Sequence, residues 1–187
     1  VDIGASSGRL ILGHHENGKM ALEAIYRFEN GMVKKDGELC WEFDRLFQEI
    51  KNGLKKCKEI GKIPVSMGVD TWGVDFVLMD KDDKVLGNTV GYRDHRNEGM
   101  DEEVYKTISL EDLYARTGIQ KAIFNTVYQL MAVKTKHPEY LEQAETMLHV
   151  PDYFHYLLTG KKTCEYTEAT AGQLVDAETK DWDYELM

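Results

Sequence analysis

A short run of small and polar residues at positions 2–9 has the composition of a phosphate-binding turn. Asp2 and Gly4 are followed by three small residues, and Gly8 and Arg9 complete the run. Glycines let the backbone turn tightly, and small side chains leave room for amide groups to point outward toward an anion. A carboxylate such as Asp2 can orient the water shell of a Mg²⁺ ion beside a polyphosphate. The run therefore predicts a phosphate site, with a plain hairpin of small residues as the alternative.

Two commoner phosphate loops do not fit this run. A Walker loop ends in Gly-Lys-Ser or Gly-Lys-Thr, and neither string occurs here. A dinucleotide-binding fingerprint leads from a strand into a helix, whereas the apolar residues that follow Arg9 continue as a strand. The pattern thus indicates a strand, a tight turn and a second strand.

A second turn, at residues 70–75, combines an aromatic ring with carboxylates. Trp72 and Gly73 lie between Asp70 and Asp75. An indole ring packs on the apolar face of a sugar, and carboxylates accept hydrogen bonds from its hydroxyl groups. The turn therefore suits a polyhydroxylated ligand. The alternative is a tryptophan that covers the edge of the core beside two turn aspartates.

A dense polar string follows at Tyr92-Arg93-Asp94-His95-Arg96. It could contact a ligand, or it could form a surface network of ion pairs, which contributes little to stability. His95 has no second histidine or cysteine at ligand spacing, which argues against a metal role. The three cysteines are widely spaced, which indicates reduced structural thiols.

Composition bounds the class of protein. The 187 residues are 42% hydrophobic and 30% charged, as in soluble globular domains, and the formal net charge is −10. This acidic balance argues against a general binder of nucleic acid or of anionic membranes. No apolar run is long enough to span a membrane and no signal-peptide pattern opens the chain, so we expect a cytoplasmic protein. The start on Val1 and the end on Met187 suggest a fragment of a longer protein.

The elements that must position these turns form an α/β pattern. Residues 1–28 predict a three-stranded meander with a hairpin at Asn17-Gly18. Asp44 is expected to cap a helix that ends at Gly61. Buried strands are expected over 64–70 and 76–80. This order resembles that of a ribonuclease-H-like core, and the resemblance implies that Asp2 and Asp70 lie at neighbouring strand ends.

From Asp101 onward the pattern is helical. Apolar residues at helical spacing predict helices over 126–136, 139–145 and 150–160, and 167–171 is expected to be a short helix or a loop. Asp152 lies at a Pro-Asp helix start, where a carboxylate complements the helix dipole.

These residues carry a specific resemblance. The string VDIGASSGR resembles the first phosphate loop of the actin-like ATPase superfamily, and within it is most similar to the rhamnulokinases of the carbohydrate kinase family. The resemblance continues through the turn at 70–75 and the aromatic-x-Asp-x-Arg string at 92–96, with Tyr92 in place of the usual Trp. Four further strings extend it, namely ARTGIQ at 115–120, FNTVYQL at 124–130, VPDYF at 150–154 with LTG at 158–160, and EYTEAT at 165–170.

The resemblance implies a fold and a division of the chain. It implies a ribonuclease-H-like mixed sheet with flanking helices, and it makes residues 1–187 the N-terminal sugar-kinase domain. The core would cover about 1–100 and a helical insertion about 101–160, with the C-terminal nucleotide-binding domain absent from this chain.

The resemblance also implies ligand contacts. Asp2 would lie in the Mg²⁺ shell. The residues that would bind the phosphates of ATP are Ala5, Ser6, Ser7, Gly8 and Arg9. The residues that would bind the sugar are Trp72, Gly73, Asp75, Tyr92 and Arg93.

The implied activity is transfer of the γ-phosphate of Mg·ATP to the primary hydroxyl of a ketose, with L-rhamnulose at O1 as the expected substrate. The general-base aspartate of these kinases lies in a His-Asp-Thr or Gly-Asp-Gln string, and neither occurs between Val1 and Met187. We therefore assign no catalytic residue here and expect the fragment alone to be inactive. The alternatives are a sibling kinase for L-fuculose, a ketopentose or glycerol, and a non-catalytic sugar- or nucleotide-binding module.

Overall fold

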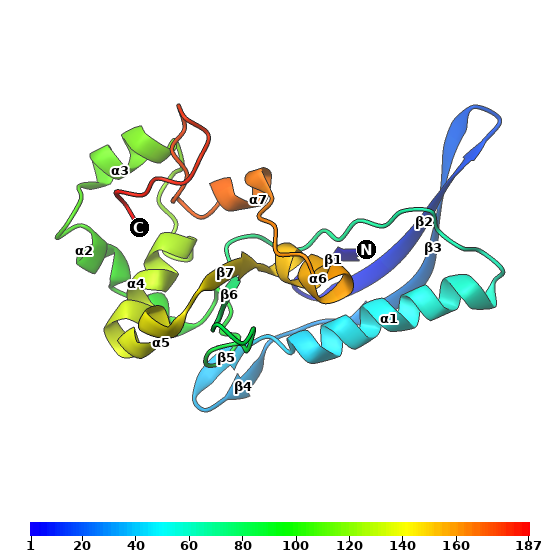
Figure 1. Cartoon of the computed structure of the whole chain (residues 1–187), viewed down its shortest axis with the longest axis horizontal. Coiled ribbons are helices and arrows are strands. Elements are labelled where there is room, and N and C mark those ends of the chain that lie inside the picture. Colours follow the sequence, from blue (N-terminus) through cyan, green and yellow to red (C-terminus); the bar gives the residue numbers. More distant parts are fainter. The chain divides into compact units, whose positions relative to one another are not determined.

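Three antiparallel strands form the sheet at the start of the chain. They are β1 (Asp2–Ile3), β2 (Ser7–Glu16) and β3 (Lys19–Glu29), in the order β1-β2-β3 (Figure 1). Asn17 and Gly18 make the β2–β3 turn with φ angles of 51° and 74°, the left-handed conformation that this residue pair favours. The predicted meander is confirmed.

The helix α1 (Phe43–Glu59) packs on this sheet through contacts with β2 and β3 (Figure 1). Its buried side includes Leu46 and Ile50, and its lysines are exposed. The prediction that Asp44 caps the helix is wrong, because Glu42 occupies that position and caps with no side-chain hydrogen bond. Asp44 lies in the first turn, where its carboxylate still complements the helix dipole.

The strand expected over 64–70 does not form. Val65 is fully exposed, and only Val69 in this segment is buried. The reason is that β1 contains just two residues, so most of the segment has no neighbouring strand with which to pair. The one bridge is parallel, between Asp2 and Asp70. Asp2 and Asp70 are therefore neighbours, as expected, but Asp70 does not lie at the end of a strand.

The computed structural model describes all 187 residues, and they divide into two units. The first unit comprises Val1–Val33 and Trp41–Trp72, and the second unit comprises Lys34–Cys40 and Gly73–Met187. The predicted division into a core and a helical insertion stays a prediction.

Two further sheets contain two strands each. β4 (Val33–Lys35) pairs with β5 (Glu38–Cys40), and β6 (Phe76–Met79) pairs antiparallel with β7 (Thr146–His149). The strand β6 agrees with the prediction. The strand β7 was not predicted and lies within the stretch expected to be helical, where pairing with β6 outweighs local pattern.

The helices that follow α1 all lie in the second unit (Figure 1). They are the 3₁₀ turn η1 (His95–Asn97) and the helices α2 (Met100–Val104), α3 (Leu110–Thr117), α4 (Thr126–Lys136), α5 (Pro138–Gln143), α6 (Val150–Thr159) and α7 (Tyr166–Thr170). Gly118 and Gly160 end α3 and α6 with φ angles near 70°, which glycine adopts without strain. The predicted helices over 126–136 and 150–160 are confirmed.

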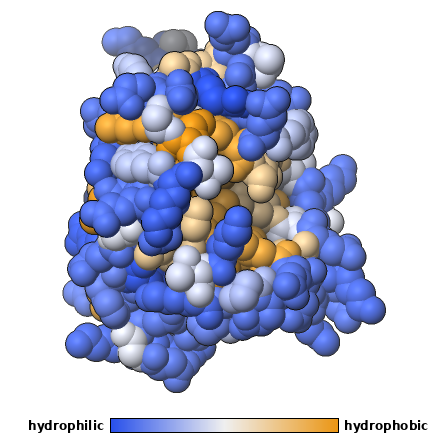
Figure 2. All heavy atoms as spheres, turned by 90° about the vertical axis from the view of Figure 1, so that its left-hand side faces the viewer, coloured by the Kyte–Doolittle hydropathy of each residue, from blue (hydrophilic) through white to orange (hydrophobic).

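The second unit has two hydrophobic clusters. One joins β6 to α4 through Phe76, Leu78 and Val133, and the other is built on Leu113 and Tyr128. On the face seen in Figure 2, hydrophilic side chains surround smaller areas of hydrophobic surface. The helices are all too short or too polar to cross a lipid bilayer.

Candidate functional site

The turn between β1 and β2 is fixed by hydrogen bonds and keeps two donors free. The Gly4 N–H donates to the Ser7 carbonyl at 2.8 Å, which closes the turn. The amide groups of Ala5 and Ser6 make no hydrogen bond within the protein. Because the turn is already held in place, these two donors are preorganised for an external acceptor such as a phosphate oxygen.

Asn30 holds this turn from the end of β3. Its Nδ2 donates to the Gly4 carbonyl at 2.8 Å, and its backbone N–H donates to the Ser6 carbonyl at 2.9 Å. Arg45 of α1 donates in turn to Asn30 Oδ1 at 3.3 Å. Sequence reasoning missed this role of Asn30. The signal that could have found it is the pairing of β2 with β3, which brings an asparagine at the end of β3 beside the turn.

Gly8 allows the turn to approach β3. A Cβ atom on Gly8 would lie 2.1 Å from the ring of Phe28. Any other residue at this position would force the ring to move. The glycine is thus required by packing on Phe28, in addition to any contact it makes with a ligand.

Asp2 and Arg9 form an ion pair across β1 and β2. Arg9 Nη2 lies 2.7 Å from Asp2 Oδ2, and both side chains are partly exposed. Oδ1 of Asp2 makes no hydrogen bond within the protein. The carboxylate of Asp70 is exposed on the neighbouring segment. Oxygen ligands of this kind are the ones that Mg²⁺ prefers, so the residues fit a hydrated magnesium ion.

Asp75 is buried at the centre of a polar network in the second unit. The residue is 0% exposed, its Oδ1 accepts from Gln129 Nε2 at 2.9 Å, and its Oδ2 accepts from the Tyr92 N–H at 3.1 Å. Arg96 donates to the other end of the Gln129 amide. Both carboxylate oxygens are therefore bound inside the protein, and Asp75 fixes the backbone at Tyr92.

The string at 92–96 divides into a buried and an exposed part. Asp94 is buried and accepts from the backbone N–H groups of Arg96 and Leu39. Burial lowers the pKa of Arg96, and nearby carboxylates oppose this shift. Tyr92 is half-buried, and exposed Arg93 donates from Nε to its hydroxyl at 3.0 Å. Tyr92, Arg93 and His95 thus reach the surface, and Arg93 and Tyr92 are joined to each other there.

Gly73 and Trp72 have different surroundings. A Cβ on Gly73 would have its nearest contact at 3.5 Å, with Glu168 Oε1, so an added methyl group would make ordinary van der Waals contacts there. Trp72 belongs to the first unit, where its ring centroid lies 4.0 Å from that of Trp41, and it is half-buried. One side of the indole is therefore occupied by another aromatic ring.

The structure brings the predicted residues into two groups. In the first unit, Asp2 and Arg9 lie beside the turn that contains Ala5 and Ser6. In the second unit, Asp75 and Tyr92 are joined by a hydrogen bond. Their assignment to ATP, magnesium and sugar stays a prediction.

A family model matches the whole chain. Residues 1–187 match the N-terminal domain of the FGGY family of carbohydrate kinases. Similar curated proteins named rhamnulokinase occur in Halalkalibacterium halodurans, at 57% identity over 187 residues, and in Oceanobacillus iheyensis, at 52%. Each match covers all of this chain and 40% of the relative, so the chain spans about two fifths of their length.

Solved structures of low sequence identity share the fold. A xylulose kinase from Rhodospirillum rubrum superposes with a TM-score of 0.84 at 20% identity, over 99% of this chain and 39% of that one. A glycerol kinase from Plasmodium falciparum, solved with ADP, superposes with a TM-score of 0.77 at 17% identity, over 99% and 39%. The predicted α/β fold of the actin-like ATPase type is confirmed. The chain belongs to the FGGY family of carbohydrate kinases, and it matches the N-terminal domain of that family.

Proposed function

We propose that the polypeptide containing this chain transfers the γ-phosphoryl group of ATP to O1 of L-rhamnulose and so forms L-rhamnulose 1-phosphate. The observation that carries the proposal is the high identity, over the entire chain, to relatives named rhamnulokinase. The chain's similarity to glycerol and xylulose kinases is a likeness of fold and does not favour one acceptor.

The turn at 4–9 supplies the proposed phosphate contacts. The free amide groups of Ala5 and Ser6 donate to phosphate oxygens, with the Ser7 hydroxyl and the Gly8 backbone beside them. When the anion binds, the Arg9 guanidinium gives up part of its pairing with Asp2 and donates hydrogen bonds to a phosphate oxygen. A guanidinium binds phosphate with well-directed hydrogen bonds. Rigid donors of this kind favour the transition state since they need no reorganisation.

Asp2 is the proposed magnesium residue. Its free Oδ1 accepts hydrogen bonds from the water shell of the ion, and Asp70 adds negative charge nearby. When bound, Mg²⁺ neutralises charge on the phosphate oxygens. The exposure of both carboxylates leaves room for this water shell.

The proposed sugar contacts come from Gly73, Tyr92 and Arg93 of the second unit. Tyr92 presents an aromatic ring, and Arg93 lies over that ring with its guanidinium carbon 5.2 Å from the centroid. Asp75 acts as a positioning residue for Tyr92, because its carboxylate oxygens are already bound. Asp75 thus contributes to sugar binding indirectly, by holding Tyr92 in position.

The general base of the reaction lies outside this chain in our proposal. The buried aspartates, Asp75, Asp94, Asp152 and Asp183, all accept hydrogen bonds from groups of the protein, and Asp2 is better placed for the ion. The 187-residue chain alone is therefore expected to release no ADP in a sugar-dependent way.

The test is ADP release by the full-length polypeptide with Mg·ATP and a panel of acceptors, namely L-rhamnulose, L-fuculose, L-xylulose, D-xylulose and glycerol. The proposal expects the highest kcat/KM with L-rhamnulose. A higher value with another acceptor would overturn the substrate while keeping the reaction. No release with any acceptor, from folded protein that still binds ATP, would favour a binding module and overturn the proposed activity.

A further inference from the structure

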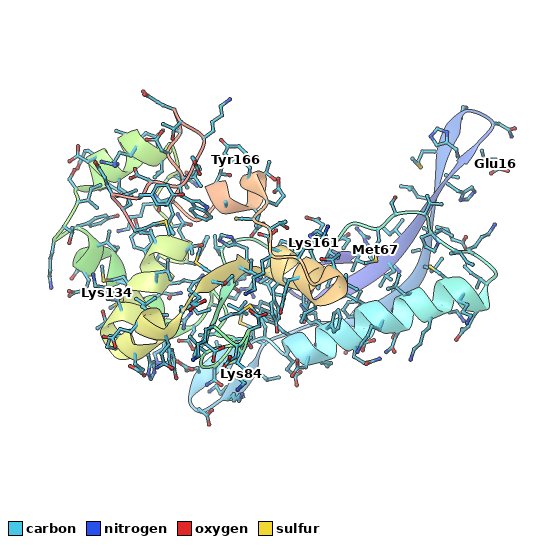
Figure 3. The ribbon with its side chains drawn as sticks, viewed as in Figure 1. Glu16, Met67, Lys84, Lys134, Lys161 and Tyr166 are labelled. Atoms are coloured by element: carbon cyan, nitrogen blue, oxygen red, sulfur yellow. The ribbon has the colours of Figure 1, made fainter.

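Three potential metal ligands meet at the start of α6, where the Val150 N–H donates to the Asp75 carbonyl at 3.2 Å. A ring nitrogen of His149, a carboxylate oxygen of Asp152 and the Sγ of Cys164 all lie within 4.8 Å of one another. His149 ends β7, Asp152 lies in the first turn of α6, and Cys164 lies in the segment that links α6 to α7. Figure 3 labels Lys161 and Tyr166, which bound that linking segment.

His149 is buried with one ring nitrogen unused. The residue is 1% exposed, and its Nδ1 has no hydrogen-bond partner. Its Nε2 lies 3.5 Å from Thr126 Oγ1. The Thr126 hydroxyl already donates its hydrogen to the Val74 carbonyl at 2.8 Å, so its oxygen can only accept from the ring.

This arrangement favours the tautomer of His149 with its proton on Nε2. In that tautomer Nδ1 carries a lone pair that is buried and has no donor. Burial lowers the pKa of His149 to about 4, which keeps the ring neutral. Metal-binding histidines are usually oriented in this way, by a hydrogen bond from the other ring nitrogen.

The other two groups can supply negative charge. Asp152 is 1% exposed and accepts from the Glu165 N–H at 3.2 Å, which fixes its carboxylate. Cys164 is exposed as a residue, but burial of its sulfur and the charge of Asp152 raise the pKa of the thiol to about 12. Without a cation the thiol therefore keeps its proton.

We propose that His149, Asp152 and Cys164 form a site for Zn²⁺, with Nδ1, one carboxylate oxygen and Sγ as ligands and water in the fourth position. Nitrogen and sulfur ligands favour Zn²⁺ over Mg²⁺ or Ca²⁺, which prefer oxygen. Binding deprotonates Cys164, so a Zn–S bond replaces the S–H bond and the proton passes to solvent. The carboxylate and the thiolate together balance the charge of the ion.

The three ligand atoms must move slightly closer together to bind one zinc ion. Ligand atoms of tetrahedral zinc lie roughly 3.5 Å apart, as metal–ligand distances of about 2.0 to 2.3 Å imply. Cys164 can make this movement, because residues 161–165 are exposed and lie outside helices and strands. The buried pair His149 and Asp152 stays in place, and the bound ion ties the linking segment to the start of α6.

The experiment titrates the metal-free full-length polypeptide with Co²⁺, which reports sulfur ligands by a thiolate-to-cobalt charge-transfer band in the near ultraviolet. We expect one equivalent of Co²⁺ to produce the band, Zn²⁺ to displace it, and binding to release about one proton per ion from the thiol. Absence of the band in the folded protein would overturn the proposal.

Variants separate the three ligands. Cys164→Ser changes an exposed residue, so it should fold and should lose the band, whereas Cys57→Ala in the first unit should keep it. Asp152→Asn retains an acceptor for Glu165 and should weaken binding through the lost charge. Thr126→Val removes the partner of Nε2 and should weaken binding by about 10- to 100-fold. A band that persists in Cys164→Ser, or an affinity unchanged in Asp152→Asn and Thr126→Val, would contradict the proposed ligand set.

Discussion

The turn between β1 and β2 and the network around Asp75 are both polar, both follow short strands or bridges, and both were singled out from sequence. They differ in where their hydrogen bonds go. In the turn, the amide groups of Ala5 and Ser6 are left without partners, while Asn30 holds the carbonyls beside them. Around Asp75, both carboxylate oxygens are bound by groups of the protein itself.

This contrast separates residues that can bind a ligand from residues that position others. A free, fixed donor at the surface keeps its hydrogen bond for an incoming group. A buried carboxylate whose oxygens are bound contributes by holding the backbone that carries Tyr92. The amino-acid composition of the β1–β2 turn and of the segment around Asp75 indicates ligand binding in both cases. Only the hydrogen-bond partners seen in the structure distinguish a ligand-binding role from a positioning role.

The largest effect on stability is expected from Asp75→Ala. The substitution leaves the Tyr92 N–H without its acceptor and removes a negative charge near the partly buried Arg96, at about 1 to 3 kcal/mol for each loss. Gln129 Nε2 keeps the carbonyls of Val74 and Phe124 as acceptors. Urea unfolding of the chain should show this as a lower midpoint with an unchanged slope. A matched change of the exposed Asp82 to Ala should leave the midpoint within error. An Asp75→Ala midpoint equal to that control would break the distinction between the two regions.

Gly8→Ala is expected to cost about 1 to 3 kcal/mol, because the added methyl group overlaps the Phe28 ring. Gly4→Ala is the matched control, since its Cβ would meet its nearest atom, the Ser7 carbonyl oxygen, at 3.5 Å. Thermal unfolding of the two variants measures the difference. Equal stabilities would show that packing on Phe28 does not determine the residue at position 8.

Arg116→Ala tests a second carboxylate that is bound inside the protein. Both oxygens of Asp183 accept from Arg116 at 2.6 Å, and this pairing holds the pKa of Asp183 below its usual value. A carboxyl group whose pKa is lowered in the folded state stabilises the fold at pH values above its ordinary pKa of about 4. This contribution is lost as the pH falls through the lowered pKa. The free-energy difference between wild type and Arg116→Ala should therefore be largest at neutral pH and shrink below about pH 4.

Unfolding in urea at several pH values checks this dependence. Lys106→Ala, which removes an exposed ion pair with Glu103, should show little difference at any pH. A difference for Arg116→Ala that grows on acidification would contradict the expected direction.

Arg9→Ala should have the smallest effect on stability and a selective effect on ligand binding. Its pair with Asp2 is partly exposed, so unfolding should change by less than about 1 kcal/mol. If Arg9 meets phosphate, the KM for ATP of the full-length polypeptide should rise about tenfold, as expected for one charge-assisted hydrogen bond. Arg27→Ala, opposite Arg9 on β3 and exposed, is the control and should leave the KM unchanged. An unchanged KM in Arg9→Ala would remove Arg9 from the proposed phosphate site.

Local patterns predicted much of the fold. The hairpin at Asn17-Gly18, the helix α1 and the glycine-terminated helix α6 follow from short-range signals, and all are present. The strand expected at 64–70 and the unpredicted β7 depend on what lies beside them. Thr146–His149 becomes a strand because β6 is available, and residues 64–68 do not because β1 is too short.

The candidate site shows the same limit. Motifs identified the turn at 4–9 and the residues at 92–96, since backbone and ligand requirements leave a local signature. The roles of Asn30 and Gln129 were missed because each acts on residues distant in sequence, at Gly4 and at Asp75. A side chain that positions another group has no signature of its own in a single sequence.

The unequal lengths of β1 and β3 affect how this chain behaves at high concentration. β3 pairs with β2 along its length, whereas β1 reaches only Gly8 and Arg9, so the edge of β2 beyond Arg9 has unpaired backbone groups. A groove of about 190 Å³, lined by Leu10–Gly13 and Pro64–Gly68, runs along this edge. Open strand edges recruit other extended chains, so the edge beside Ile11 is where copies of the chain would first aggregate during purification or crystallisation. A lysine in place of Ile11, which is 37% exposed, is the substitution that would keep such preparations monodisperse.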